Sequence, residues 1–260
     1  MLSRPYSYLF SISYYGARYK GWAKQKGQPT IEGKLERVFR FVLGHEDFRF
    51  IGSSRTDSGV NCRRGFVQLF LREKVDLEAF LPVFNLNLSG EIVLNSVQEV
   101  PRDWNLIQSV SKKTYRYFFA EEHGFPPFAS AFISQVHKFS PLESMQKKAG
   151  LFLGQHDFRD FCKITPNKSD FSREVLDAKV YLSDEFTGNF FPKEVYCFEV
   201  TGTGFLYNQV RKMASAIWHL SSEEIQERLQ CPGKIEKQVP TAPAHGLVLW
   251  ETFLDLPTFS

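Results

Sequence analysis

The sequence has few of the residue patterns that hold metal ions or build disulfide frameworks. Its four cysteines are scattered and include no C-x-x-C pair; they are Cys62, Cys162, Cys197 and Cys231. Its six histidines show no H-E-x-x-H or comparable ligand spacing. Isolated thiols of this kind are typical of a reducing compartment. The sequence therefore predicts a cytoplasmic protein and argues against a metal site.

Long apolar runs are also missing, and the charge is almost balanced. No uninterrupted hydrophobic stretch is long enough to span a bilayer, so we expect no membrane association. The formal net charge is only +3, and the basic excess lies in the first 110 residues. Apolar side chains, in contrast, are plentiful, with 26 phenylalanines among 260 residues. They can build the core of one large domain or of two modest ones.

Hydrophobic periodicity predicts the same order of elements twice. In the first half, a strand from about Tyr8 to Tyr14 precedes a helix that Thr30 caps and Gly44 ends. The other elements of this half are expected as strands at 48–51 and 66–71, a helix from 76 and a strand at 92–97. This order, βαββαβ, is that of a ferredoxin-like unit.

The second half repeats the order with one extra short helix, which Ser221 and Glu224 mark by a capping box. Its expected elements are a strand at 115–120, a helix over 140–154, strands at 174–182 and 195–201, helices over 206–217 and from 221, and a closing strand at 247–253. We therefore predict an α+β protein of two ferredoxin-like (RRM-like) halves, 1–104 and 105–260, with antiparallel sheets joined around a central cleft.

One acidic residue is distinguished by its neighbours. Asp57 follows the strand expected at 48–51 and lies in the run Ser54-Arg55-Thr56-Asp57-Ser58-Gly59. A carboxylate exposed on such a turn can act as a nucleophile or a base. Arg55 can hold a phosphate or take the place of a displaced base. The alternative is an aspartate that only shapes the turn.

Basic side chains gather in one loop of the first half. Four of them crowd a stretch that has no acidic residue; they are Arg18, Lys20, Lys24 and Lys26. Tyr19 and Trp22 lie among them, and Arg63 and Arg64 closely follow Asp57. Basic patches with aromatics suit a nucleic-acid backbone, although a solvated loop has the same composition.

The second half has candidates in three segments. Residues 112–117 are basic and aromatic, and strand alternation sends Tyr115 and Tyr117 to one face, as ordinary core or as site residues. Residues 202–213 are glycine-rich but lack the third glycine of a dinucleotide motif. Arg211 in this segment flanks an apolar stripe, where an arginine usually reaches solvent unless it pairs with a carboxylate. The third segment, the turn before Leu247, delivers that residue to the last strand.

Together these segments resemble the TruA-type tRNA pseudouridine synthases. The resemblance runs from about Tyr8 to Leu249, and four motifs occur in the family's order. They are G-R-T-D-[AS]-G-V-H at 54–61, K-x-Y-x-Y at 113–117, F-L-x-x-M-V-R at 205–211 and A-P-A-x-G-L-x-L at 242–249. Four motifs in the right order are a specific signal.

The resemblance implies a fold, a substrate and a role for each matched residue. It implies the pseudouridine-synthase fold, usually a homodimer, acting on tRNA uridines at positions 38, 39 and/or 40 of the anticodon stem-loop without a cofactor. By the match, Asp57 is the catalytic aspartate, Arg211 its partner, and Tyr115 the ring that lies against uracil. Leu247 lines the pocket, and Arg55 fills the space of the flipped nucleotide. The further RNA contacts we expect are Arg18, Lys20, Lys24, Arg63 and Arg64.

The chain departs from the family pattern at several positions. Ser54 replaces a glycine and Asn61 a histidine. The family's arginine eight residues before Tyr115, which is associated with RNA placement, is here Ile107. The missing arginine bears on the choice of substrate more than on the chemistry of the reaction. A paralogue that acts at a different RNA site is therefore one alternative. A non-catalytic RNA-binding module of two RRM-like halves is another, although no RNP motif is visible. A two-carboxylate glycoside hydrolase would need a second acid near the first.

Overall fold

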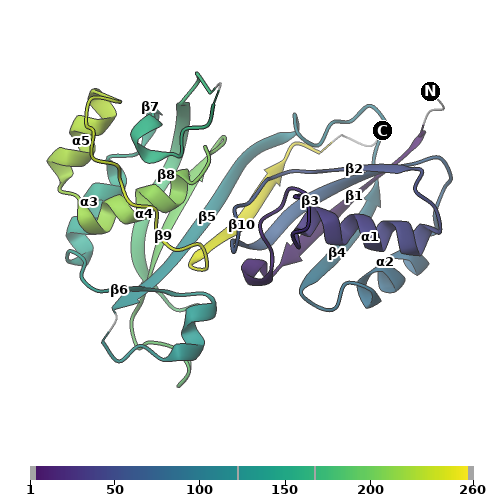
Figure 1. Cartoon of the computed structure of the whole chain (residues 1–260), viewed down its shortest axis with the longest axis horizontal. Coiled ribbons are helices and arrows are strands. Elements are labelled where there is room, and N and C mark those ends of the chain that lie inside the picture. The colour runs from purple at the N-terminus through teal and green to yellow at the C-terminus, as the bar shows by residue number, and fades with distance from the viewer. Residues whose placement is uncertain (1–3, 122, 167, 257–260) are drawn as a thin grey trace. The chain divides into compact units, whose positions relative to one another are not determined.

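The computed structural model describes residues 4–121, 123–166 and 168–256 of the chain (Figure 1). They form two compact units: one holds the described residues up to Ser111 and those from Leu249 onward, the other Lys112–Val248. Each unit combines a mainly antiparallel sheet with helices, which confirms the predicted α+β class. None of the described helices is long and apolar enough to cross a membrane.

The first unit has the predicted βαββαβ order. Its elements are β1 (Tyr6–Tyr14), η1 (Gly16–Arg18), α1 (Ile31–Leu43), β2 (Phe48–Gly52), β3 (Asn61–Leu71), α2 (Leu77–Leu86) and β4 (Ile92–Glu99). The strands lie in the order β4-β1-β3-β2, and each neighbouring pair is antiparallel. This is the arrangement of a ferredoxin-like sheet.

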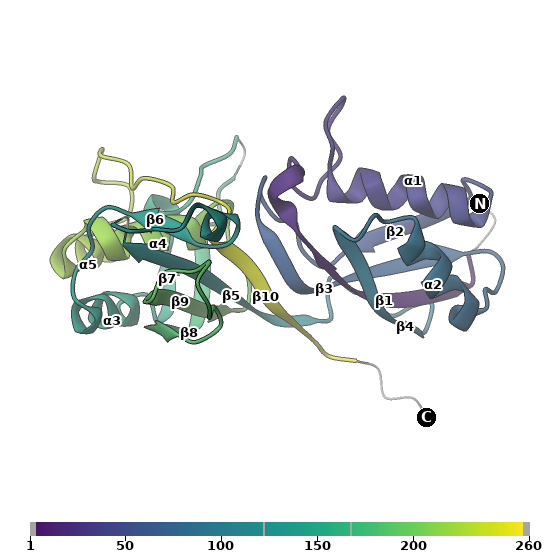
Figure 2. The same cartoon turned by 90° about the horizontal axis from the view of Figure 1, so that it is seen from below.

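Helix α1 begins and ends where its sequence predicts. The side chain of Thr30 accepts a hydrogen bond from the amide of Gly33, and Gly44 ends the helix in the left-handed conformation with φ 72°. Its apolar face packs on the sheet, along which α1 lies in Figure 2. Phe39 on that face is fully buried, and its ring centre lies 4.4 Å from that of Phe84 in α2. Such aromatic contacts add about 0.5–1.5 kcal/mol beyond the area that they bury.

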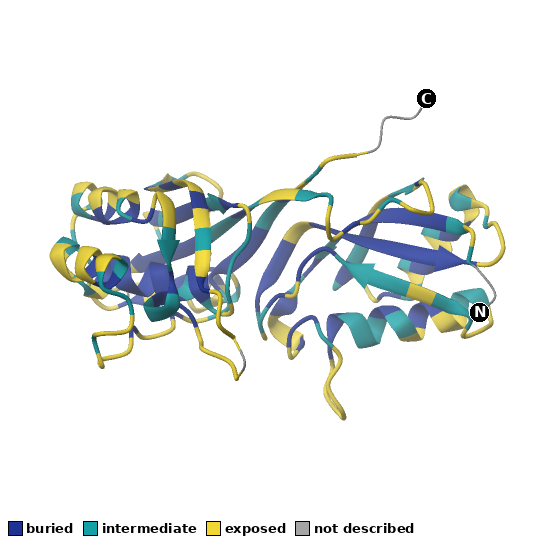
Figure 3. Cartoon of the chain, turned by 90° about the horizontal axis from the view of Figure 1, so that it is seen from above, coloured by how far each residue is buried: buried dark blue, intermediate teal, exposed yellow. Residues whose placement is uncertain are grey.

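The opposite face of this sheet has a smaller apolar cluster. Its buried members are Leu9, Phe66, Val100 and Leu106. Trp104, from the segment after β4, and Leu254, near the end of the described chain, pack against it. Strands β1 and β3 are therefore largely buried, and their ribbons are mostly dark blue in Figure 3. The cluster covers only part of the face, since Arg49 of β2 is exposed.

The second unit contains the predicted elements and two short strands that were not predicted. Its elements are β5 (Val110–Glu121), η2 (Pro127–Ala131), β6 (Ser134–Val136), α3 (Leu142–Gly150), β7 (Gly154–Asp157), η3 (Arg159–Phe161), β8 (Ser172–Ser183), β9 (Val195–Gly202), α4 (Gln209–His219), α5 (Ser222–Gln230) and the start of β10 (Leu247–Leu254). The order β5-β9-β8-β7 is antiparallel, and β6 pairs with β5 in parallel.

The predicted helix over 206–217 begins later than its apolar pattern indicates. Residues 206–208 form a turn, and Asn208 adopts the left-handed conformation with φ 62° before α4 starts at Gln209. The amide of Leu206 donates to the side chain of Gln209 at 2.7 Å, which supports this turn. The backbone therefore changes direction immediately before Arg211.

Candidate active site

The turn that carries Asp57 joins β2 to β3 in the first unit and is anchored at both ends. The amide of Ser53 donates to the carbonyl of Phe66 at 2.9 Å, and the amide of Phe66 donates to the hydroxyl of Ser53 at 3.0 Å. The hydroxyls of Tyr14 and Thr56 lie 2.7 Å apart and are buried. The turn closes where the amide of Val60 donates to the carbonyl of Asp57 at 3.2 Å. Asp57 is half-buried.

The segment 15–22 packs directly against this turn. The amide of Trp22 donates to the carbonyl of Thr56 at 3.0 Å, and a Cβ at Gly21, where φ is 95°, would lie 2.9 Å from the same oxygen. A Cβ at Gly16 would lie 1.9 Å from the carbonyl oxygen of Val60. Only glycine allows such close backbone approaches.

Asn61 stands where the resembling family has a histidine, and it has a clear structural role here. Its side-chain oxygen accepts a hydrogen bond from the amide of Gly16 at 2.8 Å. The departure at this position therefore keeps the close contact between segment 15–22 and the Asp57 turn. Arg55, two residues before Asp57, is exposed.

The second unit brings its three motif segments together. Tyr115 on β5 meets the ring of Phe205 edge to face, with ring centres 5.3 Å apart. Arg211 on α4 donates from Nε to the carbonyl of Ala242 at 2.7 Å and from Nη1 to Oδ1 of Asn208 at 3.2 Å. Segments far apart in the chain therefore meet in this unit.

These contacts argue against an Arg211 that only reaches solvent. A side chain that only reaches solvent would be mobile and exposed, whereas Arg211 is half-buried and fixed by two acceptors. The guanidinium is therefore pre-oriented, which reduces the entropy lost when it binds a further group.

Tyr117, by contrast, is a core residue. It is fully buried, and its hydroxyl donates to the carbonyl of Pro243 at 2.7 Å. Ser134 lies 2.7 Å from the same hydroxyl, and His245 Nε2 lies 3.2 Å from Ser134. Because Tyr117 gives its single hydroxyl hydrogen to Pro243, Ser134 donates to the Tyr117 hydroxyl. Burial raises the pKa of Tyr117 and lowers that of His245.

This network holds the turn before β10 close to β5. The amide of Phe118 donates to the carbonyl of Gly246 at 2.9 Å. A Cβ at Gly246 would lie 2.5 Å from the hydroxyl of Ser134, so the turn fits only glycine there. Leu247 follows and is only 5% exposed. Sequence patterns gave no signal for the roles of Ser134 and His245, because 111 positions separate them.

The basic residues of the first unit are exposed, and most are paired with carboxylates. Arg18 Nη1 lies 2.5 Å from Glu91, and Lys24 contacts Glu36. Arg63 and Arg64 share Glu251 at 3.3 and 3.0 Å. Lys20 forms no ion pair with a described residue. Exposed pairs contribute about 0–1 kcal/mol, so a phosphate can replace the carboxylate at low cost.

Lys113, two residues before Tyr115, lies on the same face of β5. Burial lowers the pKa of its ammonium group to about 8.

Among the residues that the structure describes, no three His, Cys, Asp or Glu side chains are arranged to hold a metal ion.

Comparison with known proteins relates the whole chain to one family. Residues 149–254 match the family model described as tRNA pseudouridine synthase. The tRNA pseudouridine synthase A of Ruminiclostridium cellulolyticum is 31% identical over 94% of this chain and 97% of its own length. That of Acetivibrio thermocellus is 31% identical over 93% and 97%, and that of Thermococcus kodakarensis is 32% identical over 92% and 81%. The chain therefore belongs to the tRNA pseudouridine synthase A family, a family of isomerases.

Proposed function

We propose that this protein converts uridine to pseudouridine in the anticodon stem-loop of tRNA, at positions 38, 39 and/or 40, with Asp57 as the catalytic carboxylate. Two observations support the proposal. The Asp57 turn is fixed by hydrogen bonds at both ends. Arg211 is held by Ala242 and Asn208 among the other motif residues. A site that must act on one atom of a large substrate needs such pre-organised groups.

The reaction moves one bond and keeps every atom of the base except for one exchanged proton. The bond from N1 of uracil to C1′ breaks, the base turns, and C5 bonds to C1′; C5 then loses its proton and N1 takes one up. An ionised Asp57 can attack C1′ as the bond to N1 breaks and is displaced when C5 bonds to C1′, or it can take the C2′ proton while C1′ carries positive charge and return it after C5 bonds. Both routes use the same carboxylate. Because the base must leave the helix stack, the enzyme also needs a pocket for a flipped nucleotide.

The other matched residues have supporting roles in this proposal. Arg211 pairs with Asp57 and keeps it ionised, because a guanidinium fork suits a carboxylate. Tyr115 stacks on the uracil and accepts the C5 proton, directly or through water. Leu247 lines the pocket, and Arg55 occupies the space that the flipped nucleotide leaves. The half at 1–104 supplies the aspartate, and the half at 105–260 supplies the tyrosine, arginine and leucine.

We further propose that the enzyme acts as a cytoplasmic homodimer and that its basic side chains contact tRNA phosphates. The proposed contacts are Arg18, Lys20, Lys24, Arg63 and Arg64. Ile107 is 54% exposed and has no charge with which to place RNA. The test below therefore measures the position of modification directly.

The test is to map pseudouridine in unmodified tRNA transcripts after incubation with the purified protein. We expect new pseudouridine at one or more of positions 38, 39 and 40, and nowhere else in the transcript. Modification at another position would replace the proposed target with that of a paralogue. Tight tRNA binding without any modification would favour a non-catalytic RNA-binding module.

A further inference from the structure

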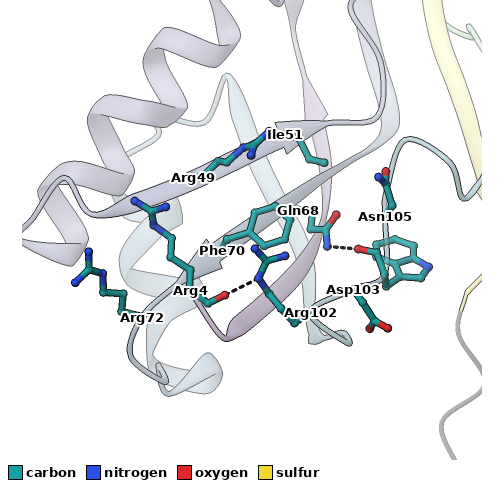
Figure 4. Close-up of a pocket in the computed structure, with 10 residues that line it drawn as sticks. Arg4, Arg49, Ile51, Gln68, Phe70, Arg72, Arg102, Asp103 and Asn105 are labelled. Carbon is teal, nitrogen blue, oxygen red and sulfur yellow. Dashed lines mark hydrogen bonds between the residues drawn. The ribbon is translucent and has the colours of Figure 1, made fainter. Parts of the chain in front are cut away.

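The first unit has a basic pocket that the proposed catalytic residues do not line. It lies on the face of the sheet opposite α1, and its volume is about 670 Å³. Four arginines line it, together with Phe70 and Trp104; they are Arg4, Arg49, Arg72 and Arg102. Figure 4 shows Arg4, Arg49 and Arg102 around the ring of Phe70.

Strand register explains why these charges share one face. Arg49 of β2 is the partner of Phe70 in β3, so both side chains project to the same side. Arg72 follows directly after the end of β3 and also lines the pocket. Phe50, next to Arg49, points to the other side, where its ring centre lies 5.3 Å from that of Phe39 in α1.

Each guanidinium is held differently. Arg102 donates from Nε to the carbonyl of Arg4 at 2.6 Å and lies over the ring of Phe70, 4.8 Å from its centre. Arg4 and Arg72 both contact Asp47, the former at 2.6 Å. Arg49 is exposed and forms no ion pair with a described residue. Two of the four guanidinium groups therefore share Asp47, and Asp103 is also in the lining, which leaves an excess of positive charge.

The floor of the pocket is rigid. Gln68 is fully buried and donates from Nε2 to the hydroxyl of Ser7 and to the carbonyl of Trp104, both at 2.9 Å. Its side-chain oxygen accepts from the amide of Leu106 at 3.1 Å. Two of these hydrogen bonds fix the segment that carries Trp104, and the third ties Gln68 to β1. A pocket that keeps its shape without a ligand loses little entropy on binding.

We propose that this pocket binds phosphate groups of an RNA backbone, as a second RNA contact beside the catalytic site. Guanidinium forks match phosphate oxygens, and an arginine stacked on an aromatic ring is already oriented for them. The choice of RNA as the source of the phosphate rests on the proposed function. The site is a positional contact, which raises affinity and carries no base specificity.

The test measures tRNA affinity over a range of salt concentrations for Arg49→Gln, and for Arg49→Gln combined with Arg102→Gln. Arg40→Gln is the matched control, because Arg40 is an exposed arginine of the same unit on α1, where it pairs with Glu36 and Glu46. For each arginine–phosphate interaction that a variant removes, we expect affinity to fall about 5- to 10-fold and the salt slope to flatten by about 0.7–0.9. Turnover at saturating tRNA should not change.

Unchanged affinity and slope in both pocket variants would overturn the proposal, and so would an equal loss in Arg40→Gln. Titration of the wild-type protein with inorganic phosphate identifies the source of the ligand. An RNA site should bind free phosphate only weakly, whereas tight phosphate binding with normal tRNA affinity in the variants would reject RNA as the occupant. A wild-type protein that makes no pseudouridine while its pocket variants bind tRNA more weakly would refute the proposed function and leave the pocket standing.

Discussion

At the scale of single residues, Arg211 shows how a side chain acquires its role from its partners. The sequence places it at the edge of an apolar stripe, where it could simply reach solvent. The structure gives it two acceptors, the carbonyl of Ala242 and the side chain of Asn208. Neither acceptor could be predicted, because Ala242 is 31 positions away and Asn208 acts through a left-handed turn.

We predict that Arg211→Met lowers pseudouridine formation about 10- to 100-fold, the range expected when a charged hydrogen bond is removed. Arg211→Lys should recover only part of the activity, because an ammonium group cannot reproduce the fork. Turnover of all three proteins at saturating tRNA is the measurement, with melting temperature recorded to detect misfolding. Full activity in Arg211→Met would refute its pairing with Asp57.

Lys113 gives a pH-dependent prediction. Its pKa of about 8 in the folded protein is below the usual 10.5, so between these values the unfolded chain binds a proton that the folded chain does not. The contribution of Lys113 to the free energy of unfolding therefore becomes more favourable as pH rises through this window. Below pH 8, burying the charged ammonium group lowers the free energy of unfolding by on the order of 1–3 kcal/mol. Replacing the side chain removes this penalty.

Lys113→Met should accordingly be more stable than the wild type at pH 7, with an advantage that shrinks by pH 9.5. Thermal unfolding of both proteins at the two pH values measures this, and the comparison cancels the titration of other groups. Lys112→Met, a change of the neighbouring exposed lysine, is the control. An advantage that is the same at both pH values would show that the ammonium group is not desolvated.

At the scale of elements, local signals decided what the sequence could predict. Helix α1 has a cap, an apolar face and a terminal glycine, and the alternation of β1 is regular, so both were predicted. Strands β6 and β7 have only three and four residues, which is too few for periodicity to show. Their places depend on pairing with β5 and β8. Propensity cannot report such tertiary pairing.

The contact between segment 15–22 and the Asp57 turn depends on Gly16. We predict that Gly16→Ala destabilises the protein by about 1–3 kcal/mol and lowers activity, because the new Cβ would overlap the carbonyl of Val60 and displace the turn. Gly150→Ala is the control, since no neighbouring atom lies within 4 Å of its new Cβ. Chemical denaturation measures both. Equal stability of the two variants would show that the segment yields without cost.

The basic loop gives a prediction for binding. Neutralising Arg18, Lys20, Lys24 and Lys26 together should weaken tRNA affinity and flatten its salt dependence by about one unit of slope or less for each side chain that contacts a phosphate. The ion pairs of Arg18 and Lys24 with glutamates do not prevent this, because exposed pairs are weak. Affinity measured at several salt concentrations is the readout. No change in affinity or slope would mean that the loop is only solvated.

At the scale of the whole molecule, the four motifs and their order are enough to indicate the family from the sequence. The α+β class and the family are confirmed. The division of the chain was harder to predict, because the residues from Leu249 onward belong to the first unit. A strand that passes from one unit to the other has the same alternation of apolar and polar residues as a strand within one unit. Periodicity therefore could not reveal that β10 begins in the second unit and continues in the first.

The central claim is that this chain isomerises tRNA uridine through Asp57, and release of tritium from tRNA labelled at C5 of uridine tests it most directly. Every pseudouridine formed frees one C5 hydrogen, because C5 takes the bond to C1′. Wild-type protein and Glu73→Gln, which alters an exposed carboxylate of the same unit, should release tritium at equal rates. Asp57→Asn should release none while still binding tRNA. No release by the wild type, or release by Asp57→Asn at the wild-type rate, would contradict the account.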